Sequence, residues 1–290
     1  MPPQPGILAP CAPAAHFLAV RLTAPEQGAP FYEALRSLPI NENVVAGLGA
    51  PLAGGAKLAV PGLRAFPVLS RPDGNVPSTQ VDAWFYVRGG DSGETLHAVR
   101  ALLARFPDGI EISEDVPAFK HAGGRDLSGY EDGTENPREA AAALAAFVQE
   151  GALAGSSFVA VQRWVHDLAV LDRLDGAERD AIIGRRRDTN EEIADAPESA
   201  HVKRTAQESF DPSAFMLRRS MPYGGTREHG LYFVAFGADL DRFERMLRRM
   251  VGEDDGVTDA LFRFSRPVSG GYYWCPPVGD GFLLLPELPA

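Results

Sequence analysis

The chain has 290 residues, enough for one large domain or for two modules of about 140 residues each. Its 28 basic and 39 acidic residues give a net charge of −11, which argues against a nucleic-acid partner because the attraction to phosphate is missing. The two cysteines, Cys11 and Cys275, are too few for a disulfide framework or a cysteine-rich metal site and are typical of a reducing compartment.

The N-terminal segment, Met1 to Ala15, is rich in proline and alanine. It lacks a basic start, a twin-arginine pair and a sustained apolar stretch. No window of the chain approaches the roughly 18 to 20 apolar residues that span a bilayer. We therefore expect a cytoplasmic protein that does not enter a membrane.

The first half of the chain predicts four strands and two helices in the order βαββαβ. The strands are indicated by β-branched and aromatic residues, and the helices by apolar residues three and four positions apart. Between the second and third strands, residues 60–78 contain four prolines and are expected to lack regular structure. The expected strands are 17–22, 44–49, 83–87 and 109–112, and the expected helices are 31–37 and 94–106.

The second half repeats the order βαββαβ after an alanine-rich helix that begins near Arg138. An insertion, residues 184–212, separates the first helix of this half from its second strand, and a loop of that length in a compact domain is typically functional or disordered. The repeat predicts an α+β fold of two ferredoxin-like modules with antiparallel sheets. The expected strands are 157–165, 215–219, 231–237 and 271–274, and the expected helices are 168–183 and 240–251.

The run from Gly129 to Pro137 reads Gly-Tyr-Glu-Asp-Gly-Thr-Glu-Asn-Pro and lies between the two halves. Taken alone, Asp132-Gly133 is most often a tight turn, because aspartate bonds its own backbone and glycine accepts positive φ. The Gly-x-x-Asp-Gly spacing, however, resembles the signature of the dye-decolorizing peroxidases, specifically their B-type bacterial branch. Five further segments resemble that family in the same order: 4–8, 199–204, 215–224, 230–233 and 264–270.

The resemblance covers nearly the whole chain and implies a specific architecture and chemistry. Residues 1–137 would form an N-terminal module that ends in the signature, and residues 138–290 a C-terminal haem-binding module, in a dimeric α/β-barrel-like arrangement. The cofactor would be haem b, one per chain. The enzyme would reduce hydrogen peroxide and oxidise small organic donors, such as dyes or phenolics, through a high-valent iron intermediate. The family also implies a homo-oligomer.

Imidazole is a common haem ligand, and six histidines compete for that role. None forms the i,i+4 pair or close cluster of a zinc site. The resemblance places His201 as the proximal iron ligand, whereas residues alone do not rank it above His229. Ligating histidines usually donate their second ring N–H to a carboxylate. Asp259 is the candidate partner of His201, with an ordinary helix cap or surface aspartate as the alternative.

On the distal side the resemblance selects Asp132 to move a proton across peroxide and Arg218 to stabilise the departing oxygen. A nearby guanidinium is expected to lower the pKa of Asp132. Strand alternation predicts that Ser220 shares the face of Arg218 while Arg219 points away, so Ser220 is a candidate distal hydrogen-bonding group. Glu131 is a further carboxylate that could lie near this site.

Two more residues carry family roles. Phe233 resembles the distal aromatic that lines the haem, although a strand phenylalanine is also an ordinary core residue. Arg185, one of three consecutive arginines, is a candidate partner for a haem propionate, because guanidinium pairs well with carboxylate.

Two other functions use the same scaffold. One is a protein that binds or moves haem or iron without peroxidase turnover, and the other is a ferredoxin-like module that binds no haem. The Asp132 and Arg218 pair distinguishes the enzyme from the first, and a Soret band after haem is supplied excludes the second. Nucleotide motifs are incomplete, because residues 47–51 lack a third glycine and residues 49–54 precede no Lys-Ser/Thr pair.

Overall fold

The computed structural model describes residues 1–71 and 73–288. Its main sheet has ten strands in the order β11-β7-β12-β2-β5-β1-β6-β9-β10-β8, and an additional pairing of β7 with β10 closes eight of them into a barrel. Every registered pair in this sheet is antiparallel. The fold is therefore mixed α and β with antiparallel strands, as the sequence predicts.

The first half supplies four neighbouring barrel strands in the order β2-β5-β1-β6. Helix α3 begins at an aspartate cap, where the Asp91 carboxylate accepts a hydrogen bond from the backbone N–H of Glu94. The strands are β1 (Ala14–Leu22), β2 (Val44–Gly49), β5 (Ala83–Gly89) and β6 (Ile110–Phe119), and the helices are α1 (Gly28–Arg36), α2 (Ala50–Gly55) and α3 (Ser92–Leu103).

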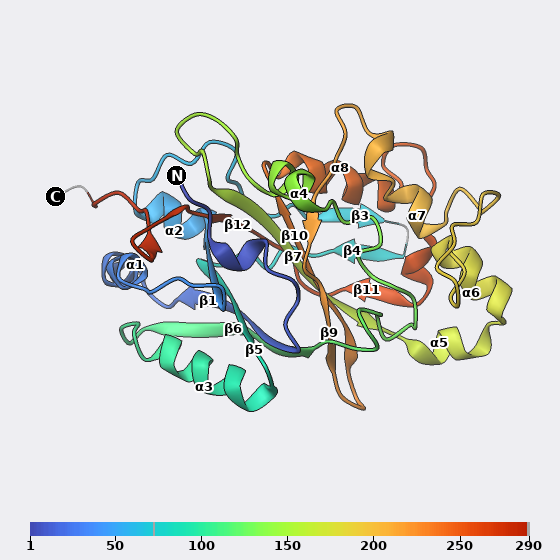
Figure 1. Cartoon of the computed structure of the whole chain (residues 1–290), viewed down its shortest axis with the longest axis horizontal. Helices are drawn as coiled ribbons and strands as arrows, with labels where there is room; N and C mark the ends of the chain where they lie inside the picture. The colour runs from blue at the N-terminus through green and yellow to red at the C-terminus, as the bar shows by residue number, and fades with distance from the viewer. Residues whose placement is uncertain (72, 289–290) are drawn as a thin grey trace.

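The second half supplies the other four barrel strands in the order β12-β7-β10-β9, and the β12–β2 and β6–β9 pairings join the halves. In Figure 1, α1, α2 and α3 lie at one end of the molecule, and α5, α6 and α7 lie at the other. The strands are β7 (Ser157–His166), β8 (Leu217–Arg218), β9 (Met221–Gly224), β10 (His229–Gly237), β11 (Ser265–Pro267) and β12 (Gly271–Cys275). The helices are α4 (Glu139–Ala146), α5 (Leu168–Arg173), α6 (Gly176–Ile183), α7 (His201–Arg204) and α8 (Asp241–Met250).

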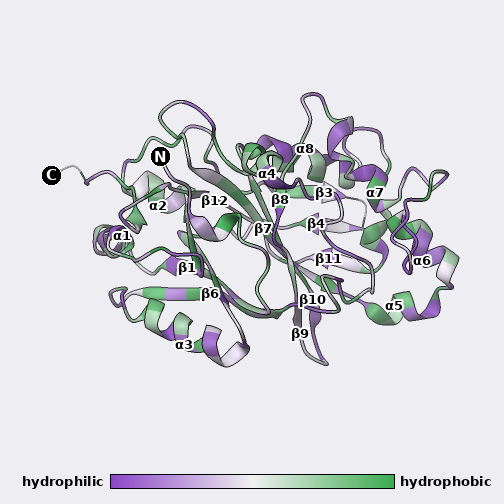
Figure 2. Ribbon diagram, viewed as in Figure 1, coloured by the Kyte–Doolittle hydropathy of each residue, from purple (hydrophilic) through white to green (hydrophobic). Residues whose placement is uncertain are grey.

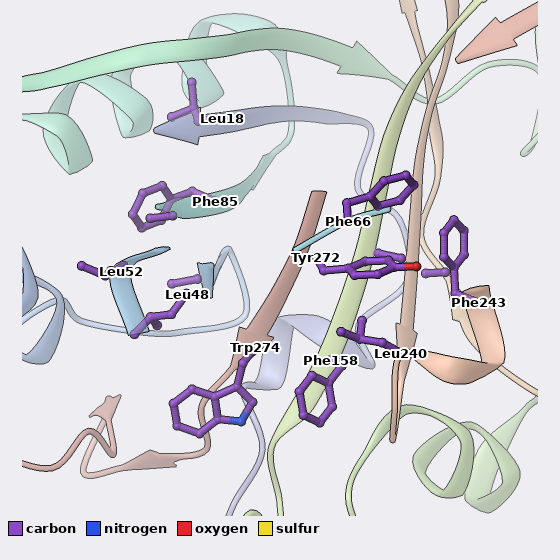
Figure 3. Close-up of a cluster of buried hydrophobic side chains, with 14 of the residues drawn as sticks. Leu18, Leu48, Leu52, Phe66, Phe85, Phe158, Leu240, Phe243, Tyr272 and Trp274 are labelled. Atoms are coloured by element: carbon purple, nitrogen blue, oxygen red, sulfur yellow. The ribbon is translucent and has the colours of Figure 1, made fainter. Parts of the chain in front are cut away.

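Strand alternation divides the core in two. One set of buried side chains, contributed by all eight barrel strands, includes the stacked rings of Phe17 and Tyr232, whose centroids are 4.3 Å apart. The opposite set packs against the helices. Figure 3 shows part of it, where Tyr272 of β12 lies beside Phe66 and Phe243, with ring centroids 4.7 and 5.9 Å away.

Helices α5, α6 and α8 carry both hydrophilic and hydrophobic residues, as amphipathic surface helices do (Figure 2). In α8 the buried residues are Phe243, Met246, Leu247 and Met250, which is the spacing that predicted this helix. No helix in residues 1–71 and 73–288 is long and apolar enough to cross a membrane.

Three local predictions were wrong. The single helix expected over 168–183 is two helices, because Leu174 is extended and a capping box of Asp175 and Glu178 starts a new one. The strand expected over 215–219 is shorter, since β8 covers only Leu217–Arg218. Residues 60–78, expected to be irregular, contain the paired strands β3 (Leu69–Arg71) and β4 (Gly74–Val76).

Candidate active site

Asn136 attaches the signature turn to strand β8. Its Oδ1 accepts a hydrogen bond from the backbone N–H of Arg218 at 2.8 Å, and its Nδ2 donates to the Arg218 carbonyl at 3.1 Å. Within the turn, Gly133 has φ of +78°, a conformation that favours glycine. The turn and the two Asn136 hydrogen bonds together bring Asp132 and Arg218 to one cavity, although the two residues come from different halves of the chain.

The guanidinium of Arg218 is incompletely paired. Its Nε is buried without a hydrogen-bond partner. Buried polar groups normally find partners, so an unpaired guanidinium nitrogen beside a cavity indicates a group adapted to something bound there.

Burial raises the pKa of the Asp132 carboxyl, and the negative charge of Asp126 raises it further. The charges of Arg218 and His201 act in the opposite direction but do not outweigh desolvation. Arg218 therefore lowers the pKa of Asp132, as the sequence predicts, but the net shift is upward because burial of the carboxylate has the larger effect.

His201 is the first residue of α7, in the inserted segment, and its ring is joined to Asp259. The distance from His201 Nδ1 to Asp259 Oδ2 is 2.8 Å, and Asp259 is buried with 1 % of its surface exposed. The other carboxylate oxygen of Asp259 accepts from the backbone N–H of Leu261 at 2.8 Å. Asp259 is thus both a helix cap and the partner of His201, so both interpretations from the sequence describe the same residue.

The described hydrogen bonds of the His201 ring involve only Nδ1, and the residue lines both parts of the cavity that also contains Asp132. A ring held by a carboxylate at one nitrogen, with the other nitrogen open, is the usual arrangement of a metal-ligating histidine. Residues 1–71 and 73–288 contain no group of three or more His, Cys, Asp or Glu side chains that could hold a metal ion alone.

The cavity has a wide polar part of about 670 Å³ and a narrow part of about 130 Å³. Asp132, His201 and Arg218 line both parts. The narrow part is walled by apolar side chains from β7, β10 and α8, among them Trp164, Leu231 and Met246. A ligand bound across both parts would therefore meet apolar walls in the narrow part and charged side chains in the wide part.

Phe233 lines the narrow part, where its ring packs against Phe243 with centroids 5.6 Å apart. Arg185 lines the wide part, but its guanidinium already bonds Glu135 at 2.6 Å and Glu192 at 2.9 Å. Glu131 lies at the rim and is exposed, and its carboxylate accepts hydrogen bonds from Arg125 and Asn190.

Ser220 does not line the main cavity. It lies in the connection between β8 and β9, where its hydroxyl accepts a hydrogen bond from the backbone N–H of Val234 at 3.3 Å. Ser220 instead lines a small pocket of about 90 Å³ behind Asp132 and Arg218, together with Arg219. Arg218 lines this small pocket as well, and the strand is interrupted between Arg218 and Met221.

Sequence reasoning missed Asn136, Asp126 and His166. The first belongs to the signature run, so its position was a usable signal. The other two form a buried pair that lines the narrow part, with His166 Nε2 3.1 Å from Asp126 Oδ1. A histidine at the end of a strand gives no such signal by itself.

Comparison with known proteins places the chain among characterised relatives. Residues 123–280 match the model of the family "Dyp-type peroxidase, C-terminal". The dye-decolorizing peroxidase of Mycolicibacterium paratuberculosis is 32 % identical over 313 residues, covering 99 % of this chain and 87 % of that protein. The dye-decolorizing peroxidase of Mycobacterium tuberculosis is 31 % identical over 224 residues, covering 74 % of this chain and 67 % of that protein.

Solved structures agree with the sequence matches. A dye-decolorizing protein from V. cholerae superposes with a TM-score of 0.84 at 30 % identity, covering 93 % of this chain and 96 % of that chain. A DypB variant from Rhodococcus jostii RHA1, solved in complex with heme, superposes with a TM-score of 0.86 at 26 % identity and covers 93 % of this chain and 94 % of that chain.

Proposed function

The chain belongs to the Dyp-type, or dye-decolorizing, peroxidase family, and from this premise we propose that His201, Asp132 and Arg218 are the working residues of its haem site. The protein is a haem peroxidase whose substrates are hydrogen peroxide and an organic electron donor. The observation that carries the residue assignment is that these three side chains line one cavity while Asp259 bonds the His201 ring.

His201 would hold the cofactor iron through Nε2. The buried carboxylate of Asp259 fixes the ring orientation and the position of the Nδ1 proton, and it makes the imidazole a stronger electron donor. When bound, haem supplies an iron that accepts peroxide and provides the electrons that break its O–O bond.

Asp132 would move a proton from one peroxide oxygen to the other, so that the departing oxygen leaves as water. A raised pKa suits the first half of this task, because the carboxylate then takes a proton more readily than an exposed aspartate does. Arg218 would stabilise the negative charge that develops on the departing oxygen, and its unpaired Nε is available for that role.

The remaining sequence assignments support these three residues. Phe233 would form part of the cofactor wall. Arg185 would bind a propionate by exchanging one of its glutamate partners, Glu135 or Glu192, for the cofactor carboxylate. Ser220 would act indirectly, by bonding the backbone of β10 behind the distal pair.

We further propose that residues 1–137 and 138–290 are two ferredoxin-like modules and that the second binds haem b. The sheet orders β2-β5-β1-β6 and β9-β10-β7-β12 support this, since each sets the first and third strands of its half side by side in the centre. Membership of the B-type branch, a homo-oligomeric state and a cytoplasmic location are proposals that rest on the sequence.

The test of the ligand assignment compares two histidines. His201→Ala should lose the ferric haem spectrum of the unmodified protein and most peroxidase activity. His229→Ala should change neither, because His229 lies in strand β10 with its Nδ1 3.0 Å from the Gly225 carbonyl oxygen and lines neither part of the cavity. The opposite result for the two variants would show that the iron ligand has been misassigned.

A further inference from the structure

A buried cluster of three polar side chains lines the narrow part of the cavity and has no role in the reaction steps assigned to His201, Asp132 and Arg218. It joins Asp126, three residues before the signature run, to His166 at the end of β7 and Ser265 of β11, which are 9 %, 6 % and 2 % exposed. His166 Nδ1 lies 2.7 Å from Ser265 Oγ, and its Nε2 lies 3.1 Å from Asp126 Oδ1. An imidazole with its proton on Nε2 satisfies both contacts, because it donates to Asp126 and accepts from Ser265.

Asp126 organises the loop that leads to Asp132. Its Oδ2 accepts from the backbone N–H of Ser128 at 2.9 Å, its carbonyl accepts from Gly129 N–H at 2.9 Å, and its own N–H donates to the Tyr130 carbonyl at 2.9 Å. One aspartate therefore closes residues 126–130 into a tight loop. Asp132 follows two residues after this loop, and its N–H donates to the Gly124 carbonyl at 3.1 Å.

His166 connects this loop to the barrel. Residue 166 pairs with Ser265 in the β7–β11 ladder, so both its backbone and its ring are held by the sheet. The ring also packs against Phe264, with centroids 5.6 Å apart. The loop before Asp132 is thus attached to strand β7 through a single buried side chain, while Asn136 attaches the segment after Asp132 to β8.

We propose that Asp126, held by His166, is a positioning residue for Asp132: it fixes the signature loop on strand β7 so that the Asp132 carboxylate faces the cavity beside Arg218. This inference deepens the proposed function and rests on the role assigned there to Asp132. Asp126 acts through Asp132 and is not itself assigned a contact with peroxide.

The charge of Asp126 adds a measurable signature. Burial raises the pKa of Asp126, but its hydrogen bonds from His166 and Ser128 outweigh burial and lower the pKa to about 2, so its carboxylate is ionised near neutral pH. Among the charged groups with the largest effects on Asp132, Arg218 and His201 favour its ionised form and Asp126 favours its protonated form. Lys120, Arg125, Arg219 and Glu131 also line pockets with Asp132. Removing the charge of Asp126 should therefore move the ionisation of Asp132 to lower pH.

The test is a double-mutant cycle on the haem-loaded full chain, read by the rate of reaction with hydrogen peroxide as a function of pH. Asp126→Asn keeps the shape of the side chain and should lower the rate roughly 10- to 100-fold, as loss of a supporting partner typically does. It should also shift the acid limb of the profile to lower pH. In an Asp132→Asn background the same change should alter the rate less than about twofold, because a positioning residue loses its effect when its target is gone.

His16→Gln is the matched control. His16 is another buried histidine paired with an aspartate, Asp115, but it lies on β1 and lines neither part of the cavity. Its substitution should leave the pH profile in place. Far-UV circular dichroism and the Soret band check that each variant is folded and loaded. If Asp126→Asn fails these checks, Ser265→Ala, which removes only the contact to His166 Nδ1, takes its place in the cycle.

Two results would overturn the inference. One is an equal loss from Asp126→Asn in both backgrounds, which would mean that Asp126 supports the fold without acting through Asp132. The other is an unchanged rate and an unchanged acid limb in Asp126→Asn. By contrast, if Asp132→Asn alone leaves the rate unchanged, the proposed role of Asp132 fails, and the two failures are distinguishable.

Discussion

Replacing Asp259 by asparagine tests how the protein controls the cofactor through His201. The carboxylate accepts two hydrogen bonds, from His201 Nδ1 and from Leu261 N–H, each at 2.8 Å. Asparagine has one acceptor oxygen and can keep the cap on Leu261, but its amide group would then face the His201 ring as a donor. The ring loses an anionic partner and becomes a weaker electron donor to iron.

The size of the effect follows from that bond. A hydrogen bond to a charged group contributes about 1.5–3 kcal/mol. If all of this free energy stabilised the oxidised iron and none of it the reduced iron, its loss would raise the one-electron reduction potential by roughly 60–130 mV, at about 59 mV per tenfold change in the equilibrium. Part of the bond persists in both states, so we expect a rise of roughly 30–100 mV.

The assay is a spectroelectrochemical titration of haem-loaded Asp259→Asn beside Asp255→Asn. Asp255 loses the same charge at the rim of the same cavity, but its partner is Arg204 and it does not contact His201. A potential for Asp259→Asn no higher than that of Asp255→Asn would refute the reasoning, because the effect would then be one of net charge and not of the His201 hydrogen bond.

Three further predictions concern Asn136, Asp132 and Asp126. Asn136→Ala should lower peroxidase turnover by roughly tenfold or more, measured at saturating donor, because both hydrogen bonds that hold the turn on Arg218 are lost. The rate of the peroxide reaction should rise with pH, because the ionised form of Asp132 is the base. The midpoint of this rise should lie above the ordinary aspartate pKa of 3.8, because burial raises the pKa of Asp132, and Asp132→Asn should abolish the rise. The pKa of Asp126 is lowered to about 2, so its ionised form stabilises the fold above about pH 4, and that contribution is lost as pH falls toward 2. In Asp126→Asn the free energy of unfolding should therefore fall less steeply as the pH is lowered from about 4 to 2.

Much of the fold follows from local pattern in the sequence. The strand predicted over 44–49 coincides with β2, and the helix predicted over 240–251 differs from α8 by one residue at each end, because periodicity reports burial directly. The break between α5 and α6 was also readable, since Asp175 and Glu178 have the spacing of a capping box. The interruption after Arg218 was not, because it depends on pairing with strands far along the chain.

The site divides in the same way. Family motifs indicated Asp132, Arg218 and His201, and the structure sets them around one cavity. The buried contact between Asp126 and His166 joins residues 40 positions apart, and no local pattern predicts it. The pKa direction of Asp132 was missed because desolvation depends on everything that surrounds the carboxyl, whereas the sequence showed only its candidate charge partner.

The most direct measurement of the central claim is stopped-flow absorption of the haem-loaded protein mixed with hydrogen peroxide, for the unmodified chain and for Arg218→Leu and Asp132→Asn. Arg218→Leu should retain the resting Soret band but react on the order of a hundredfold more slowly or worse, because fixed positive charge is lost where the departing oxygen becomes negative. Asp132→Asn should show a comparable or smaller loss with an altered pH dependence. If both variants keep haem and react as fast as the unmodified protein, the distal pair is not catalytic, and a haem-handling role becomes the better account.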